Sequence, residues 1–128
     1  MADEDLPAGE DPLSKVESSA GAVVLETTAD AAILRVTGAL DLALAPKLQQ
    51  VVERAARLQP ALMVIDLTGV DFLASAGMSV LLRAHRTRPE NTQVRLVAES
   101  RIILRPLQVT RLTDELEVHP TMSAALAG

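Results

Sequence analysis

Ser75 is the residue whose type and position make it the best candidate for chemistry in this chain. It follows a run of apolar residues and a short turn, and it begins a segment in which apolar residues recur at helical spacing. A serine hydroxyl at the start of a helix can accept a hydrogen bond from an unpaired amide and cap the helix, which stabilises it by about 1 kcal/mol. The same hydroxyl could also take part in a reaction.

A nucleophilic role for Ser75 is disfavoured by its surroundings. Residues 74–77 read Ala-Ser-Ala-Gly and lack the glycine two positions before the serine that a hydrolase elbow uses. His85 lies about 15 Å further along the predicted helix, at roughly 1.5 Å per residue, so it is too distant to act as a base. His119 precedes a proline in a predicted edge strand or loop and is expected at the surface. We therefore predict no catalytic residue and no enzyme activity.

Metal and nucleotide sites are also not indicated. Asp66 and Asp71 flank the turn before Ser75, but two carboxylates without a third ligand do not make a persuasive metal site. The chain has no glycine-rich loop that could hold phosphate groups. We expect no metal and no cofactor on this chain, so any nucleotide involved would be bound by a partner.

The composition narrows the range of partners and compartments. Phe72 is the single aromatic residue, and the basic residues are dispersed along the chain, so neither base stacking nor a basic face for nucleic acid is expected. The absence of cysteine fits a reducing compartment. No apolar run approaches 18 residues and no secretion signal is present, so we expect no membrane contact and a cytoplasmic location.

The net charge of −5 is concentrated in residues 1–20. This segment has six acidic residues and one lysine, together with prolines and little apolar surface to bury. Such a composition is typical of a disordered leader that aids solubility. We therefore predict a disordered acidic leader over 1–20 and one domain over 21–128. The acidic residues are Asp3, Glu4, Asp5, Glu10, Asp11 and Glu17.

Hydrophobic periodicity and turn residues predict alternating strands and helices. Strands are expected over 22–26, 31–36, 61–67, 94–98 and 116–118, and helices over 43–58, 75–87, 101–107 and from 121 onward. Thr68 and Gly69 are expected to end the third strand, and Pro106 to weaken or end the third helix. Ser100 and Thr121 are expected to cap helices, and Phe72 to lie in the core.

This order of elements predicts an α/β fold. We expect a mixed, mostly parallel sheet of four to five strands, with about four helices packed mainly on one side. Functional groups in such sheets collect at the loops that follow the carboxyl ends of parallel strands, which is where Ser75 is predicted.

Residues 71–78, Asp-Phe-Leu-Ala-Ser-Ala-Gly-Met, resemble the phosphoacceptor loop of STAS domains, the family of bacterial anti-sigma factor antagonists. Residues 34–41 are similar to the family's strand that ends in glycine, two variable residues and aspartate. Segments 94–97, 105–107, 118–121 and 124–126 resemble the closing third of actinobacterial members. The resemblance covers about residues 22–127.

The resemblance implies a switch that depends on phosphorylation. In the family, the unmodified antagonist binds an anti-sigma factor that is also a serine kinase, and a sigma factor is released. The kinase uses its own ATP and magnesium to phosphorylate the antagonist, and a serine phosphatase resets it. By position, Ser75 is the phosphoacceptor. The matching partner-binding positions are Asp41, Ser75, Ala76, Gly77, Met78 and Ser79.

Other interpretations of these residues stay open. Asp41 fits an ordinary turn or capping residue as well as a binding role. For Met78, core packing is favoured over partner contact. Ala74 and Ala76 replace an aspartate and a second hydroxyl residue that many relatives have, which leaves Ser79, inside the helix, as a poor second acceptor. The alternative function is therefore a STAS scaffold without a switch, in a signalling or transport complex.

Overall fold

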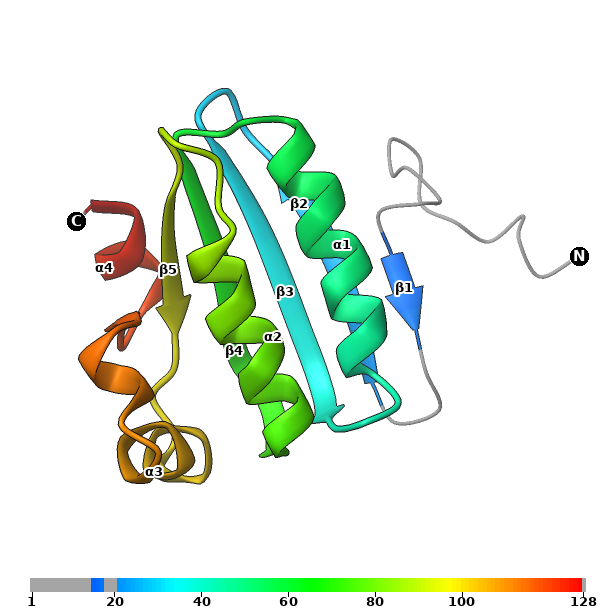
Figure 1. The fold of residues 1–128 in the computed structure, drawn as a ribbon, viewed down its shortest axis with the longest axis vertical. Coiled ribbons are helices and arrows are strands. Elements are labelled where there is room, and N and C mark those ends of the chain that lie inside the picture. The colour runs from blue at the N-terminus through cyan, green and yellow to red at the C-terminus, as the bar shows by residue number, and fades with distance from the viewer. Residues whose placement is uncertain (1–14, 18–20, 128) are drawn as a thin grey trace, which may run out of the picture.

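A computed structural model describes residues 15–17 and 21–127 (Figure 1). The strands are β1 (Lys15–Glu17), β2 (Gly21–Thr27), β3 (Ala31–Leu40), β4 (Leu62–Leu73), β5 (Gln93–Val97) and β6 (Glu117–His119). The helices are α1 (Ala45–Arg57), α2 (Ser75–Arg86), α3 (Arg101–Val109) and α4 (Met122–Ala127), with a short 3-10 helix, η3, at Leu112–Asp114.

The strands of the described residues form one mixed sheet in the order β1-β2-β3-β4-β5-β6. The pairs β1–β2 and β2–β3 are antiparallel, and the pairs from β3 to β6 are parallel. The prediction of a mixed, mostly parallel sheet with four helices is confirmed. The additional edge strand β1 falls within the segment predicted as a disordered leader, and the remainder of that segment, 1–14 and 18–20, lies outside the described residues.

Helices α1 and α2 pack on one face of the sheet, and α4 packs on the other (Figure 1). The apolar stripe of α1, which includes Leu48 and Val51, contacts a core that also contains Leu34, Ile65 and Leu81. Each such fully buried side chain contributes about 1.5–3 kcal/mol by its removal from water. A smaller cluster joins α4 to the opposite sheet face through Ile33, Val64, Val97 and Ala125.

Strand β4 is longer than predicted, because Thr68 and Gly69 do not end it. The pairing with β3 continues past a register shift, so that Gly69 lies opposite Thr37. A β-carbon at Gly69 would lie 2.8 Å from the Thr37 Cγ2 atom. The glycine therefore allows close contact at a bulge in the sheet, and β4 reaches Leu73, two residues before Ser75.

An ion pair lies on the sheet face opposite α1 and α2. The buried Asp66 carboxylate accepts a hydrogen bond of 2.9 Å from Arg35 Nη1 and bonds of 3.0 and 2.8 Å from the Thr68 amide and hydroxyl. Arg35 also pairs with Glu26 at 3.0 Å. Asp66 is thus a paired residue inside β4 and not part of the turn before Ser75.

The ends of the later helices agree with prediction at two caps and differ at one proline. Ser100 Oγ accepts from the Ile102 amide at 3.2 Å, and Thr121 Oγ1 accepts from the Ala124 amide at 3.0 Å. Pro106, however, does not end α3, which continues to Val109. The carbonyl of Pro106 accepts from both the amide and the hydroxyl of Thr110, at 3.1 and 2.7 Å, and these bonds support the last turn.

Candidate partner-binding site

Ser75 is the first residue of α2 and is exposed. The residue that precedes the helix is Ala74, in an extended conformation, and its carbonyl accepts from the amides of Gly77 and Met78 at 3.0 and 3.1 Å. No side-chain hydrogen bond caps this helix, so the prediction that Ser75 caps it is wrong. The hydroxyl is therefore not occupied by a capping interaction and faces solvent.

The start of α2 favours an anion at this position. The amides of Ser75 and Ala76 lie in the first turn and have no carbonyl one turn earlier in the helix to pair with. The helix dipole places partial positive charge at the same end. A phosphoryl group on Ser75 would thus lie at the end of α2 that tolerates negative charge best.

Gly77 fixes where this helix begins relative to β3. A β-carbon at Gly77 would lie 2.6 Å from Leu40 Cγ and 2.9 Å from the Leu40 carbonyl oxygen. That carbonyl also accepts from the Ala74 amide at 3.0 Å. The residues before and after Ser75 are therefore both held against the end of β3, which gives Ser75 a defined position.

Asp41 holds the turn between β3 and α1. Its Oδ1 atom accepts from the amides of Ala43 and Leu44 at 3.0 and 3.1 Å, and its backbone carbonyl accepts from Ala45 at 2.9 Å. The structure thus shows the turn role that the sequence left open. This turn directs Leu42 into solvent, with 77% of its surface exposed.

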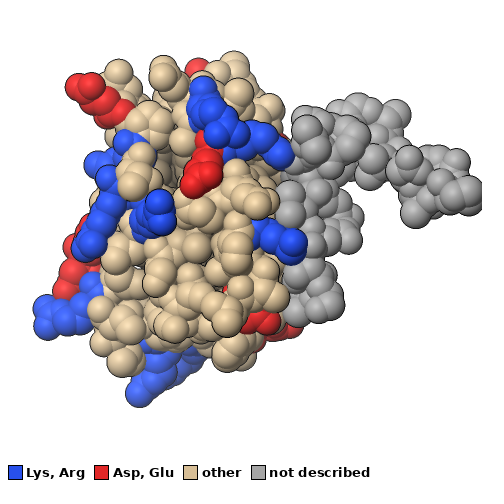
Figure 2. All heavy atoms as spheres, turned by 45° about the vertical axis from the view of Figure 1, so that its right-hand side comes forward, with Lys and Arg blue, Asp and Glu red and all other residues tan. Residues whose placement is uncertain are grey.

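A shallow groove of about 260 Å³ runs between α1 and α2, beside Ser75. The turn and the start of α1 contribute Leu42, Ala45, Pro46 and Gln49, and α2 contributes Ala76, Ser79, Val80 and Arg83. Figure 2 shows a broad uncharged area over the lower part of this side of the molecule, with charged side chains of both signs around it. A groove of this composition suits an apolar segment of another protein.

Ala76 and Ser79 were predicted from the sequence as partner-binding residues, whereas Leu42 and Arg83 were not. The available signal for Leu42 was its place in a turn, two residues before the apolar stripe of α1 begins at Leu44. An apolar side chain in a turn has no core to enter, and here it remains exposed.

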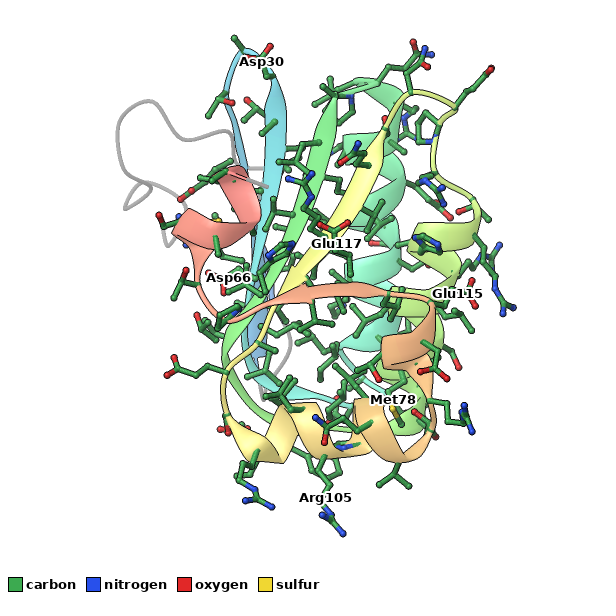
Figure 3. The ribbon with its side chains drawn as sticks, turned by 90° about the vertical axis from the view of Figure 1, so that its left-hand side faces the viewer. Asp30, Asp66, Met78, Arg105, Glu115 and Glu117 are labelled. Atoms are coloured by element: carbon green, nitrogen blue, oxygen red, sulfur yellow. The ribbon has the colours of Figure 1, made fainter. Side chains whose placement is uncertain are left out.

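Met78 packs against the core, as predicted, whereas Phe72 does not. Met78 is half-buried against the core, and its sulfur lies 3.8 Å from the Thr110 hydroxyl at the end of α3 (Figure 3). Phe72 is 53% exposed, so its predicted core position is wrong. The register shift opposite Gly38 and Ala39 changes the alternation, which leaves Val70 and Leu73 buried and Phe72 at the surface.

The described residues contain no group of three or more potential metal-ligating side chains. None of the helices over 21–127 is long and apolar enough to cross a membrane. His85 contacts Arg88 near the far end of α2, and His119 Nε2 lies 2.7 Å from Glu117. The features of the site are therefore a hydroxyl, free amides and an apolar groove, which suit contact with another protein.

Known proteins with similar sequence and structure support this interpretation. The STAS domain model matches residues 22–125. The anti-sigma-F factor antagonist RsfA of Mycobacterium tuberculosis is 34% identical over 100 residues, which make up 76% of this chain and 78% of that protein. The crystal structure of an anti-sigma factor antagonist from Mycobacterium paratuberculosis matches with a TM-score of 0.79 at 27% identity, covering 92% of this chain and 96% of that one.

The phosphorylated form of the Bacillus cell fate determinant SpoIIAA shares the fold, with a TM-score of 0.61. Its sequence is 18% identical, and the match covers 82% of this chain and 96% of that chain. At this identity the comparison establishes a common fold.

Proposed function

The chain belongs to the STAS-domain family of anti-sigma factor antagonists, and we propose that it acts as such an antagonist. In its unphosphorylated form it binds an anti-sigma factor in the cytoplasm, and a sigma factor is thereby released. The observation that carries the proposal is the position of Ser75, exposed at the start of α2 and next to the groove between α1 and α2. Family membership also supports the prediction that this chain is not an enzyme.

Phosphorylation of Ser75 by the anti-sigma factor is the proposed switch. The partner kinase supplies ATP and magnesium, and a serine phosphatase removes the group. The phosphoryl group adds about −1.5 to −2 charges beside a groove lined by residues such as Leu42, Pro46 and Ala76. A dianion that loses water at an apolar interface costs several kcal/mol, so affinity would fall about a hundredfold or more.

The same charge leaves the domain itself intact under this proposal. The unpaired amides and the dipole of α2 interact favourably with an anion at Ser75. The switch would thus act on the complex and not on the fold. Ala74 and Ala76 leave Ser75 as the acceptor of this loop, since Ser79 lies one turn inside α2.

A purification from native cells tests the function. Wild-type protein and the variants S75A and S75D serve as baits, and S123D, on the exposed surface of α4, is the matched charge control. We expect wild type, S75A and S123D to recover a kinase-like anti-sigma factor, and S75D to lose it. Recovery of transport or scaffold proteins without such a kinase would favour the scaffold alternative.

A phosphorylation assay tests the switch separately. The recovered kinase is incubated with the chain, ATP and magnesium, and the product is mapped by mass spectrometry. We expect phosphate on Ser75 alone and no incorporation into S75A. Phosphate at another residue, or equal partner affinity for the modified and unmodified chain, would contradict the switch.

A further inference from the structure

Helix α1 carries a row of basic side chains on its outer surface. Lys47, Arg54 and Arg57 are seven and three residues apart, a spacing that places them on one side of a helix. Ala45 and Gln49, which line the groove shared with α2, lie on the other flank from Lys47 and Arg54, and Arg57 projects from the outer side between the two flanks. We refer to Lys47, Arg54 and Arg57 as the α1 basic row.

The α1 basic row has no acidic partner in the part of the chain that the structure describes. None of its three residues forms an ion pair with a carboxylate of residues 21–127, the part of the chain whose side chains the structure describes. The Arg54 Nη2 atom is buried and has no hydrogen-bond partner there. Buried donors are normally paired, so the described residues leave this guanidinium with one unsatisfied donor.

The row also lies near β1, the strand that follows segment 1–14 in the chain. Helix α1 contacts β1 and lies between β1 and α2 (Figure 1). Figure 2, which brings this side forward, shows basic side chains at its top and right. The segment 1–14 joins the domain at Lys15, the first residue of β1. Its attachment point is thus next to the flank of α1 that carries the row.

The charge of segment 1–14 is complementary to the row. It has five carboxylates, Asp3, Glu4, Asp5, Glu10 and Asp11, and no lysine or arginine. Fourteen residues can span up to about 46 Å when extended, whereas the 13 residues of α1 extend over about 20 Å. The segment is therefore long enough to follow the helix. Arg101 and Arg105 also lack an ion pair among residues 21–127, but α3 contacts β4, which is separated from β1 by β2 and β3.

We propose that the acidic segment 1–14 binds along the α1 basic row, through its carboxylates and the guanidinium groups of Arg54 and Arg57. Because the segment is tethered beside the row, its effective concentration there is in the millimolar range. Even weak ion pairs would then form in an appreciable fraction of the molecules. The contact covers the outer flank of α1 and leaves the groove and Ser75 accessible on the other flank. The proposal does not depend on the antagonist function.

Paramagnetic relaxation on the full chain tests this contact. The sequence has no cysteine, so A8C gives a single site for a nitroxide label. We expect signal loss at the amides of Lys47, Gln50, Arg54 and Arg57 in low salt, and recovery near 1 M NaCl, where the screening length is about 3 Å. The substitution of all three basic residues, K47Q/R54Q/R57Q, should restore the signals of α1. The control R101Q/R105Q should leave the signal loss unchanged.

A second variant tests the contact from the acidic side without altering the domain. In D3N/E4Q/D5N/E10Q/D11N, labelled through the same A8C substitution, the signal loss along α1 should disappear. Signal loss centred on α3, no local signal loss, or loss that persists in both the acidic and the basic variants would overturn the proposal. The proposal would also be overturned if K47Q/R54Q/R57Q bound the partner protein less well while the signal loss along α1 stayed unchanged. The α1 basic row would then bind that partner and not segment 1–14.

Discussion

Gly77 and Leu40 are in contact across the junction of α2 and β3, at a distance that excludes any side chain on residue 77. A β-carbon there would lie 2.6 Å from Leu40 Cγ and 2.9 Å from the Leu40 carbonyl oxygen. The latter is backbone and cannot rotate away. The requirement for glycine two residues after Ser75 is therefore a packing requirement, and it links the position of the hydroxyl to the core.

The variant G77A should consequently be less stable and should bind its partner less well. We expect a loss of about 1–3 kcal/mol in the free energy of unfolding, since overpacking against backbone forces α2 to shift. Urea denaturation measures the stability, and a titration with the anti-sigma factor measures the affinity. The control S79A, at an exposed position of the same helix, should be close to wild type in stability. An equally stable G77A would contradict the packing argument.

Leu42 should matter for binding and not for stability, because 77% of its surface is exposed. In L42S we expect a change of less than about 0.5 kcal/mol in the free energy of unfolding, as for most surface substitutions. Affinity for the anti-sigma factor should fall about tenfold or more, as for a buried apolar residue at the centre of an interface.

The control for this experiment is L58S. Leu58 is also exposed, at 58%, but it lies at the opposite end of α1 from the groove. Calorimetric titration of both variants gives the comparison. Equal losses of affinity in L42S and L58S would indicate that the groove beside Ser75 is not the binding surface.

The sequence predicted the elements well where local signals and burial agree. The start of α2 at Ser75, the caps at Ser100 and Thr121, and the starts of β3, β4 and β5 follow from hydrophobic periodicity and side-chain chemistry. Each of these features is decided by residues within a few positions of one another, so a single sequence contains the necessary information.

The errors arose where contacts between distant segments decide the structure. Gly69 has the residue type of a strand end, but its pairing with Thr37 on β3 extends β4 beyond it. Phe72 has the residue type of a core residue, but a register shift turns it to the surface. The residue at the N-cap position of α2 is Ala74 instead of Ser75, and its amide donates to the Leu40 carbonyl on β3. Register and bulges depend on the partner strand, which the local sequence does not specify.

Asp66 should contribute to stability through several hydrogen bonds at once. D66A removes the acceptor of the Thr68 amide and hydroxyl and one partner of Arg35. We expect a loss of about 1–3 kcal/mol in the free energy of unfolding, because three hydrogen bonds to a buried, charged acceptor are lost together. The control E26Q breaks the other ion pair of Arg35, between side chains that are about half exposed, and should cost less than about 1 kcal/mol. Equal losses of unfolding free energy for D66A and E26Q, measured by urea denaturation, would contradict this account.

Glu117 should make the free energy of unfolding depend on pH in the acidic range, below about pH 4.5. The hydrogen bond with His119, together with the charge of Arg95, lowers the pKa of Glu117 from its usual value of about 4.5. A carboxyl whose pKa is depressed in the folded state stabilises the fold above its unfolded-state pKa, and this contribution is lost as the pH falls through the folded-state value. In E117Q the decline in stability below about pH 4.5 should be shallower.

Thermal unfolding between about pH 3 and pH 6 checks this expectation for Glu117. E90Q is the control, since Glu90 is exposed and forms no ion pair with another described residue. If E117Q and E90Q changed the profile in the same way, the interaction with His119 and Arg95 would not be the cause.

S75D should be at least as stable as wild type, although it carries a charge at the proposed binding surface. A carboxylate at the first position of α2 interacts with free amides and with the helix dipole, which is worth about 0.3–1 kcal/mol at low ionic strength. S79D, one turn further into α2, should gain little, because the effect falls off after the first turn. Urea denaturation at low and high salt separates the two, since only the gain in S75D should decrease with salt. A destabilised S75D would mean that negative charge at this residue disturbs the fold itself, so that phosphorylation could not act through partner binding alone.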